Sequence, residues 1–590
     1  MLFTWHPARH EMLIGTRFAN TVQIHRVVTP GGARTQLTFF PDRIAGADYS
    51  RVSADTFVFA KDIGGNEFFQ LFRYDVKTGK STLLTDGKSR NEGPLWSPRG
   101  TQIAFTTTRR NGRDTDIWLM DPMKPDSARM LVENTESGWY PTSWSPDEKT
   151  LLAERYISAE ETEVYRFDTA TGARTVLLKR TPQTTYNNPQ FSPDGKSIWL
   201  TTTENSDFER LAWMDLASGK MTIATPGINW DVQGFDLSKD GRNVAYIVNE
   251  DARGVLHVMD TSSRKDVPLP AGMPAGSITG VSWHPDSTIL GFTVASSQTP
   301  SDIYSLDLRT VKIERWTYSE TGGVNTSEFR ESETIHWRSF DGLTISGLYY
   351  RPPARFTGPR PVIVNIHGGP ESQARAGYLG ANNYLINELG VAMIFPNVRG
   401  SSGYGKKFLS LDNGTKREDS VKDIGALLDW IAGQKDLDAS RVMVMGGSYG
   451  GYMTLASMTH YNDRLRCAID VVGISNWVTF LEHTEAYRRD LRRVEYGDER
   501  DPRMRDFLAT ISPQASARNI TKPMMIVAGK NDPRVPYTEG AQMTATIRSN
   551  GGVVSYLLAD DEGHGYSKKA NRDFQFFASV AFIRQYLLGR

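Results

Sequence analysis

The strongest constraint on the fold is a short motif that recurs along the first half of the chain. An aromatic residue or leucine is followed by a polar turn and a strand-like run, and the motif returns every 44 to 48 residues. Self-similarity at this period, with several short strands per unit, is typical of β-propeller blades, which must stack in a ring to bury their faces. The alternative is an all-β sandwich with chance similarity. The sequence predicts seven blades, because the motif has seven copies centred on His6, Ser50, Ser97, Ser145, Ser192, Ser238 and His284.

The pattern changes after the seventh copy, which ends near Arg315. Residues 318–330 read as a linker, and strand-like runs then alternate with helical ones. In residues 421–431, for example, Val421, Ile424, Leu428 and Ile431 fall on one helical face. Such alternation favours a mostly parallel sheet covered by helices. We therefore expect a propeller over residues 1–325 and an α/β-hydrolase domain over residues 326–590.

The second half contains a candidate nucleophile. Residues 446–451 read GGSYGG, directly after a strand-like run and directly before a helix-compatible one. Glycine on both sides of a serine in this context predicts a nucleophile elbow, a tight turn that exposes the hydroxyl of Ser448. The alternative is an ordinary turn serine.

An acid and a histidine follow in the order that such a nucleophile needs. Asp532 follows the strand-like run 524–529, and His564 follows the run 553–558. A serine hydroxyl needs a histidine to take its proton, and the imidazole needs a carboxylate to fix its tautomer and stabilise its charge. Ser448, Asp532 and His564 are therefore the predicted catalytic triad. Rival acids are Asp560, Asp561 and Glu562, which lie too close to His564 in sequence to come from a separate loop.

The predicted reaction also needs two donors for an oxyanion. One is the backbone N–H of Tyr449, and the other comes from the loop that begins at His367, in the sequence HGGPE. His367 either donates from its ring or braces the loop. No HExxH spacing or cysteine pair accompanies it, so we expect no metal and no cofactor.

Composition restricts the partners. The chain has 68 basic and 68 acidic residues, so charge gives no support for binding nucleic acid or an anionic membrane. No apolar run approaches the roughly 18 residues needed to span a bilayer. The first residues lack the pattern of a signal peptide, so we expect a cytoplasmic location, with the periplasm or secretion left open if a signal peptide was removed. The single cysteine, Cys467, excludes an internal disulfide, and a homo-oligomer is left open.

A seven-bladed propeller followed by an α/β-hydrolase domain resembles the prolyl oligopeptidase family of serine peptidases. The motifs that carry the resemblance are GGSYGGY at 446–452, NVRGSSGYG at 397–405, DPRVP at 532–536 and EGHG at 562–565. The HGGP run at 367–370 looks most like the acylaminoacyl peptidase branch, whereas other branches carry a tyrosine near that position as an oxyanion donor.

The resemblance implies further site residues. Arg534 matches an arginine that binds the carbonyl of the residue preceding the cleaved one. Trp477 and Phe480 lie where relatives build an aromatic pocket for the residue before the scissile bond, and Val535 would add to its apolar wall. For Arg534 the alternative is a solvent-facing loop residue, and for the aromatic pair it is core packing.

Two charged features are harder to assign. Glu160 and Glu161 are reminiscent of the acids with which dipeptidyl relatives hold a free amino terminus, but a solvated hairpin tip is the favoured interpretation. An arginine-rich stretch from Arg488 to Arg505 is interleaved with acidic residues, which indicates an ion-paired helix and loop. One of these arginines could instead bind a terminal carboxylate of the substrate.

Together, these features predict a serine peptidase that cleaves oligopeptides through an acyl-enzyme. By resemblance, the propeller would exclude folded proteins from the site. A carboxylesterase with the same triad is the alternative within enzymes, and an inactive propeller scaffold for protein binding is the alternative outside them.

Overall fold

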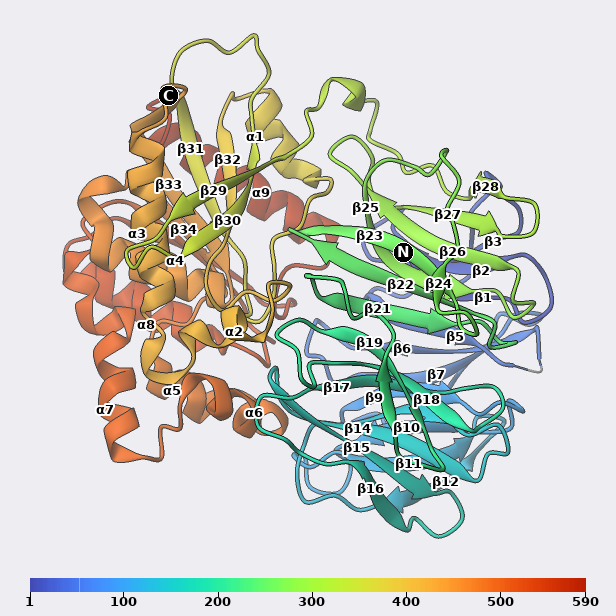
Figure 1. The fold of residues 1–590 in the computed structure, drawn as a ribbon. Helices are drawn as coiled ribbons and strands as arrows, with labels where there is room; N and C mark the ends of the chain where they lie inside the picture. Colours follow the sequence, from blue (N-terminus) through green and yellow to red (C-terminus); the bar gives the residue numbers. More distant parts are fainter. Residues whose placement is uncertain (52) are drawn as a thin grey trace.

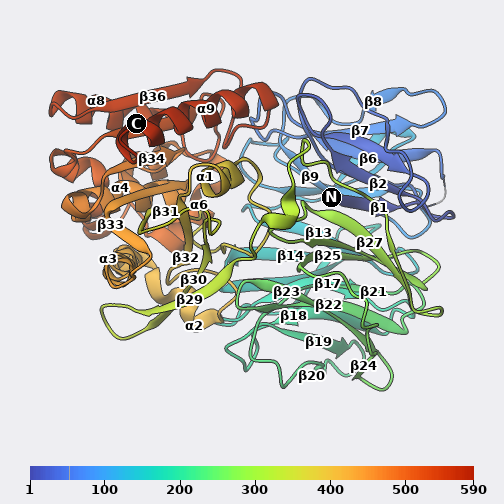
Figure 2. The same cartoon turned by 90° about the horizontal axis from the view of Figure 1, so that it is seen from above.

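The computed structural model describes residues 1–51 and 53–590 and consists of a propeller beside an α/β domain (Figure 1). In this part of the chain, the first 28 strands form seven four-stranded antiparallel sheets. Seen from above, these sheets lie together on one side of the α/β domain (Figure 2). The predicted seven-bladed propeller and α/β-hydrolase fold are therefore confirmed.

Each blade is built from four consecutive strands. Their bounds are, blade by blade, β1 (Leu2–Trp5), β2 (Met12–Thr16), β3 (Gln23–Val27) and β4 (Thr35–Gln36); β5 (Ile44–Tyr49), β6 (Thr56–Lys61), β7 (Gln70–Asp75) and β8 (Ser81–Leu83); β9 (Asn91–Trp96), β10 (Ile103–Thr107), β11 (Asp116–Asp121) and β12 (Lys124–Val132); β13 (Trp139–Trp144), β14 (Thr150–Ser158), β15 (Glu161–Asp168) and β16 (Arg174–Leu178); β17 (Tyr186–Phe191), β18 (Ser197–Thr202), β19 (Arg210–Asp215) and β20 (Met221–Ile223); β21 (Val232–Leu237), β22 (Asn243–Glu250), β23 (Arg253–Asp260) and β24 (Lys265–Asp266); β25 (Ser277–Trp283), β26 (Ile289–Ala295), β27 (Asp302–Asp307) and β28 (Lys312–Arg315).

The repeated tryptophan of the sequence motif joins neighbouring blades. Trp144 Nε1–H donates to the carbonyl oxygen of Leu95 in the preceding blade at 3.1 Å. Trp96 and Trp283 make the equivalent bonds, to Asp48 O at 3.2 Å and Asp236 O at 3.0 Å. A buried indole N–H needs a hydrogen-bond acceptor. Each of these bonds therefore satisfies the buried tryptophan and also fixes the orientation of its blade relative to the preceding one.

The ring closes by side-chain contacts between the first and last blades. Trp5 of β1 donates to Ser282 O of β25 at 3.0 Å and packs edge-on against Trp316, with ring centroids 5.3 Å apart. His10 and Asp286 form an ion pair at 2.8 Å across the same seam. No strand is shared between these blades within the described residues, so side-chain packing and these polar contacts hold the seam.

The α/β domain contains one eight-stranded sheet, in the order β29-β30-β32-β31-β33-β34-β35-β36. The strands from β31 onward pair in parallel, and β29 and β30 form an antiparallel edge. The bounds of the strands are β29 (Glu333–Arg338), β30 (Thr344–Tyr350), β31 (Arg360–Ile366), β32 (Ala392–Asn397), β33 (Leu437–Gly447), β34 (Cys467–Val471), β35 (Met524–Gly529) and β36 (Val554–Ala559). In such a sheet, loops at the carboxyl ends of the strands carry the functional residues.

Helices cover this sheet, and several of them also contact the propeller. Their bounds are α1 (Asn383–Asn387), α2 (Lys406–Leu409), α3 (Asp419–Ala432), α4 (Tyr449–Tyr461), α5 (Trp477–His483), α6 (Ala486–Tyr496), α7 (Pro502–Ile511), α8 (Tyr537–Ser549) and α9 (Lys569–Tyr586). Helix α6 lies between the two domains, beside blades three and four (Figure 1). Of the helices in residues 1–51 and 53–590, none is both long and apolar enough to cross a membrane.

Replacing Trp144 by Phe tests the bond between blades. The variant keeps the aromatic ring but leaves Leu95 O without its donor, so we expect the free energy of unfolding of the propeller to fall by about 1 kcal/mol. Urea denaturation measures the change. As a control, Trp213→Phe should leave the stability nearly unchanged, because the indole N–H of Trp213 has no acceptor among the described residues; an equal loss in both variants would contradict this role for Trp144.

Candidate functional site

Ser448 lies at the turn between β33 and α4 with strained backbone angles. Its φ is 61° and its ψ is −121°, values that a non-glycine residue rarely adopts. The backbone N–H of Ser448 donates to Val471 O at 2.9 Å, which anchors the turn to the next strand. The geometry is that of the predicted elbow, with the side chain half-buried at the carboxyl end of the sheet.

The glycines around Ser448 are required by close approach of the backbone. A Cβ on Gly450 would overlap the carbonyl oxygen of Ile366, and one on Gly446 would overlap the carbonyl oxygen of Gly450. Because the elbow presses against β31 in this way, side chains are excluded at both positions.

Asp532 and His564 come together at the ends of β35 and β36. His564 Nδ1 lies 2.7 Å from Asp532 Oδ2, and the buried carboxylate also accepts from the backbone N–H groups of Arg534 at 2.8 Å and Val535 at 3.0 Å. These bonds orient the carboxylate and with it the imidazole. Glu562, a rival acid, is buried and bonded instead to Ser567 and Lys568.

Ser448 Oγ makes no hydrogen bond within residues 1–51 and 53–590, to His564 or to any other group. The structure thus pairs the acid with the histidine and leaves the serine hydroxyl unengaged. In active sites without bound substrate, the hydrogen bond between the nucleophile and its histidine is often long or poorly aligned, and it tightens when substrate binds.

The loop after β31 passes directly over Ser448. A Cβ on Gly368 would lie 3.1 Å from Ser448 Cβ. Among the described residues, no acceptor takes the backbone N–H of Gly368 or of Tyr449, so both donors are free. Tyr496 fixes the loop, because its hydroxyl donates to Gly369 O at 2.6 Å.

The ring of His367 braces this loop. Nδ1 lies 2.8 Å from Gly368 O, and Nε2 lies 2.9 Å from Ser401 Oγ. Burial lowers the pKa of His367 and favours the neutral ring, which then donates from Nδ1 to the carbonyl. Of the two roles that the sequence left open, the contacts favour bracing.

Arg534 is held by the propeller. Its Nε donates to both carboxylate oxygens of Glu67, at 2.9 and 3.0 Å, from the turn between β6 and β7. Burial of Glu67 opposes its charged form, but the nearby guanidinium outweighs this effect and lowers the pKa of the carboxyl. Sequence reasoning missed Glu67, because nothing local distinguishes it from other acidic turn residues.

Trp477, Phe480 and Val535 are buried in the core of the hydrolase domain. Trp477 packs against Tyr452 and Tyr496, with ring centroids 4.7 Å apart in both cases. These contacts are those of core packing, the alternative that the sequence left open for the aromatic pair.

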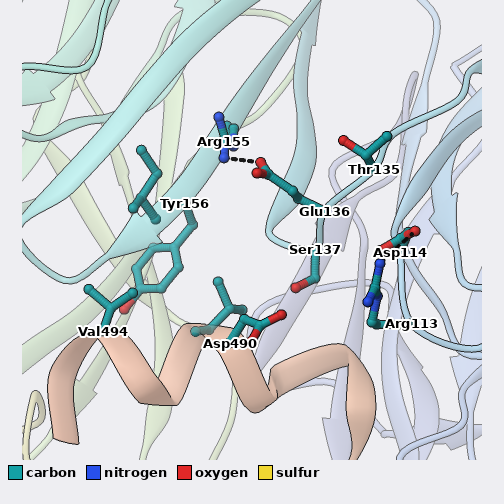
Figure 3. A pocket seen from close by; sticks show the side chains of 11 residues that line it. Arg113, Asp114, Thr135, Glu136, Ser137, Arg155, Tyr156, Asp490 and Val494 are labelled. Atoms are coloured by element: carbon teal, nitrogen blue, oxygen red, sulfur yellow. Dashed lines mark hydrogen bonds and ion pairs between the residues drawn. The ribbon is translucent and has the colours of Figure 1, made fainter. Parts of the chain in front are cut away.

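Two cavities lie where the propeller meets α6. One, of about 260 Å³, is lined by Glu136, Arg155 and Tyr156 of the propeller and by Asp490 and Val494 of α6 (Figure 3). In the figure, Arg155 is joined to Glu136 above the helix.

The second cavity, of about 110 Å³, is lined by four acids, Glu160, Glu161, Glu371 and Glu495, and by one cation, Arg180, which is paired with Glu161 at 2.6 Å. Glu160 is not a solvated hairpin tip, as the sequence suggested, because Asn413 of the hydrolase domain donates to its Oε1 at 3.0 Å. Burial and the adjacent Glu161 raise the pKa of Glu160.

Comparison with known proteins agrees with this architecture. Residues 378–590 match the prolyl oligopeptidase family, and residues 70–278 match the TolB beta propeller domain. The dipeptidyl aminopeptidase BIII of Pseudoxanthomonas mexicana is 27% identical over 558 residues, which cover 91% of this chain and 79% of that protein. The human acylamino-acid-releasing enzyme is 26% identical over 267 residues, or 44% of this chain and 35% of that protein.

Solved structures have the same fold. One from a study of two prolyl endopeptidases has a TM-score of 0.88 at 17% identity and covers 100% of this chain and 89% of its own. The sequence motifs favoured the acylaminoacyl peptidase branch, but relatives of both the dipeptidyl and the acylamino-acid-releasing kind match, so the comparisons support the family and do not single out that branch. The chain belongs to the prolyl oligopeptidase family of serine peptidases.

Proposed function

We propose that this chain hydrolyses peptide bonds of short oligopeptides through an acyl-enzyme on Ser448. The observation that carries the proposal is the strained turn of Ser448 after β33 together with His564 after β36, whose Nδ1 lies 2.7 Å from the buried carboxylate of Asp532. The hydrolase domain of residues 326–590 would supply the chemistry, and the propeller of residues 1–325 would restrict the size of the substrate.

In the first step, Ser448 Oγ attacks the scissile carbonyl carbon while His564 Nε2 takes the hydroxyl proton. The C–N bond then breaks, and His564 gives the proton to the leaving amine. Asp532 stabilises the imidazolium through its bond to Nδ1. A water molecule, activated by the same histidine, subsequently releases the acyl group from Ser448.

The negative charge on the carbonyl oxygen would be stabilised by two backbone donors. One donor is the N–H of Tyr449, the first residue of α4, and the other is the N–H of Gly368 in the loop over Ser448. Preorganised donors of this kind act strongly where water is excluded. Under this proposal His367 acts indirectly, by fixing the loop that carries Gly368.

The location of the propeller supports selection by size. Its blades face the loops that carry Arg534 and His564, so a substrate has to enter between the domains or along the propeller axis (Figure 2). We propose that short, flexible peptides meet this requirement and folded proteins do not. The cytoplasmic location and the absence of a nucleic-acid or membrane partner stay predictions from the sequence.

Covalent labelling tests the nucleophile. A fluorophosphonate probe should label the wild-type chain at one serine and should fail on Ser448→Ala, because only an activated serine attacks the probe. Ser457→Ala is a matched control on α4 and should keep full labelling. Labelling that persists in Ser448→Ala would contradict the proposal. Comparing hydrolysis of a peptide with that of a simple ester would then separate a peptidase from a carboxylesterase.

The acidic cavity favours peptides with a free amino terminus as one class of substrate. Glu371 belongs to the loop over Ser448, so the cavity lies beside the proposed acyl site. Glu371 and Glu495 are paired with Arg492, and Glu161 with Arg180, whereas Glu160 has no cationic partner among the described residues. An ammonium group of the substrate would supply that partner and favour the charged form of Glu160. The naming of one relative as a dipeptidyl aminopeptidase supports the same mode.

Glu160→Gln tests this mode. For the wild type, we expect kcat/KM for a free-amino peptide to exceed that for its acetylated form by about tenfold or more, since an ammonium–carboxylate bond is charge-assisted. The variant should bring the ratio close to one, whereas Glu328→Gln, an exposed control, should preserve it. If the wild type instead cleaves the acetylated peptide faster than the free-amino peptide, and Glu160→Gln keeps that preference, the acylaminoacyl mode is favoured.

A further inference from the structure

Arg488 lies on α6, the helix between the two domains. Within residues 1–51 and 53–590, its side chain forms no hydrogen bond and no ion pair. Four other arginines of the stretch, Arg492, Arg493, Arg500 and Arg505, are paired with acids, as the mixed charges of the sequence predicted, whereas Arg489 bonds to the carbonyl oxygen of Thr484. Arg493, for example, contacts Asp490 and Glu499.

The arginines on either side of Arg488 in space have acidic partners. Arg492, one helical turn further along α6, lies 3.4 Å from both Glu371 and Glu495. Arg534 is bonded to Glu67. Both of these neighbouring arginines thus have acidic partners, whereas Arg488 has none among the described residues.

Its surroundings make this charge unfavourable. Burial lowers the pKa of Arg488 to about 10, and the charges of Arg492 and Arg534 act in the same direction. Two tyrosines, Tyr487 and Tyr496, oppose the shift, and no carboxylate is among the groups that act on it most strongly. An enclosed charge without a partner is costly, and such groups gather at functional sites.

Arg488 shares one face of α6 with Arg492, which contacts Glu371 in the loop over Ser448. Residues 488, 492 and 495 are spaced by four and three, so they share one face of α6. The adjacent face carries Asp490 and Val494, which line the cavity in Figure 3. Tyr487 stacks on the guanidinium of Arg90 at 4.2 Å and so fixes the start of α6 against the propeller.

Two contacts connect this face to the chemistry. Arg492 reaches Glu371, in the loop that passes over Ser448. Arg534 is two residues after Asp532, to which its backbone N–H donates at 2.8 Å. A group bound at Arg488 therefore lies between the oxyanion loop and the loop of the catalytic acid.

We propose that Arg488 binds a carboxylate of the peptide substrate and makes this chain selective for peptides that carry one there. A guanidinium binds a carboxylate through two parallel N–H···O bonds, which gives both affinity and orientation. The carboxylate is either an acidic side chain next to the cleaved residue or the free carboxyl terminus. The inference rests on the proposed peptidase function.

Matched substrates distinguish the two sources. The first pair consists of chromogenic anilides, Ala-Glu-Phe and Ala-Gln-Phe, which differ only by the charge of the middle side chain. The second pair consists of an internally quenched peptide with either a free carboxyl terminus or a terminal amide. We expect the wild type to cleave the charged member of one pair with a kcat/KM at least tenfold higher, mainly through a lower KM.

Arg488→Met should bring that ratio close to one while leaving the neutral member unaffected, and Arg488→Lys should restore part of it. Arg503→Met removes an exposed arginine of α7 and should leave both members unchanged. A wild type that prefers neither charged member would overturn the inference. Equal loss on both members in Arg488→Met would also overturn it, because that result indicates a structural role.

A binding measurement separates this inference from the proposed reaction. In Ser448→Ala protein, calorimetry with Ala-Glu-Phe amide, Ala-Gln-Phe amide and Ala-Gln-Phe with a free carboxylate reports affinity without turnover. Arg488→Met in this background should weaken binding of one charged peptide about tenfold or more and spare the neutral one. Unchanged binding of both charged peptides would refute the role of Arg488, whatever the fate of the catalytic proposal.

Discussion

The site depends on the contact between one propeller turn and the two loops that carry Asp532 and His564. The turn between β6 and β7 approaches so closely that a Cβ on Gly65 would lie 2.5 Å from the Gly563 nitrogen. Asn531 Nδ2 donates to Gly64 O at 3.1 Å from the other loop. Both glycines have positive φ, 57° at Gly64 and 76° at Gly65. At Gly65 backbone meets backbone, whereas at Gly64 the side-chain amide of Asn531 makes the contact.

Three consequences follow from this backbone contact. It places the propeller directly against the residue before His564, it brings Glu67 within reach of Arg534, and it fixes the spacing of the loops that hold the acid and the histidine. On the opposite side, Ala252 at the tip of the β22–β23 hairpin is buried in an apolar cluster of the hydrolase domain. The adjacent Asp251 accepts from the hydroxyls of Ser346 at 2.6 Å and Tyr404 at 3.0 Å, so blade six joins the hydrolase domain through apolar and polar contacts together.

Sequence alone predicts the parts of this account that are encoded locally. The number of blades follows from the repeated motif. Its tryptophan bonds to a residue of the preceding blade, as Trp144 does to Leu95. The elbow follows from glycines that the neighbouring backbone requires, and the acid and histidine follow from strand ends. Each of these signals lies within a few residues of the group that it positions.

The remaining features arise between segments far apart in the chain. Glu67 meets Arg534 across 467 positions, and Glu160 meets Asn413 across 253. Arg488 is distinctive only because the acids near it are taken by other arginines, which a linear pattern of mixed charges does not reveal. The sequence also does not decide the role of Trp477 and Phe480 in α5, because a packed core and the wall of a binding pocket require the same residue types.

The central claim is that the blade-two turn positions the catalytic loops, and Gly65→Ala tests it most directly. Gly219→Ala is a matched control, because Gly219 has a similar φ of 69° but open space where a Cβ would lie. We predict that Gly65→Ala lowers kcat/KM for a peptide at least tenfold while both variants keep the wild-type circular dichroism spectrum, because a 1 Å displacement of catalytic groups costs about a hundredfold in rate. Full activity in Gly65→Ala, or an equal loss in Gly219→Ala, would contradict the account.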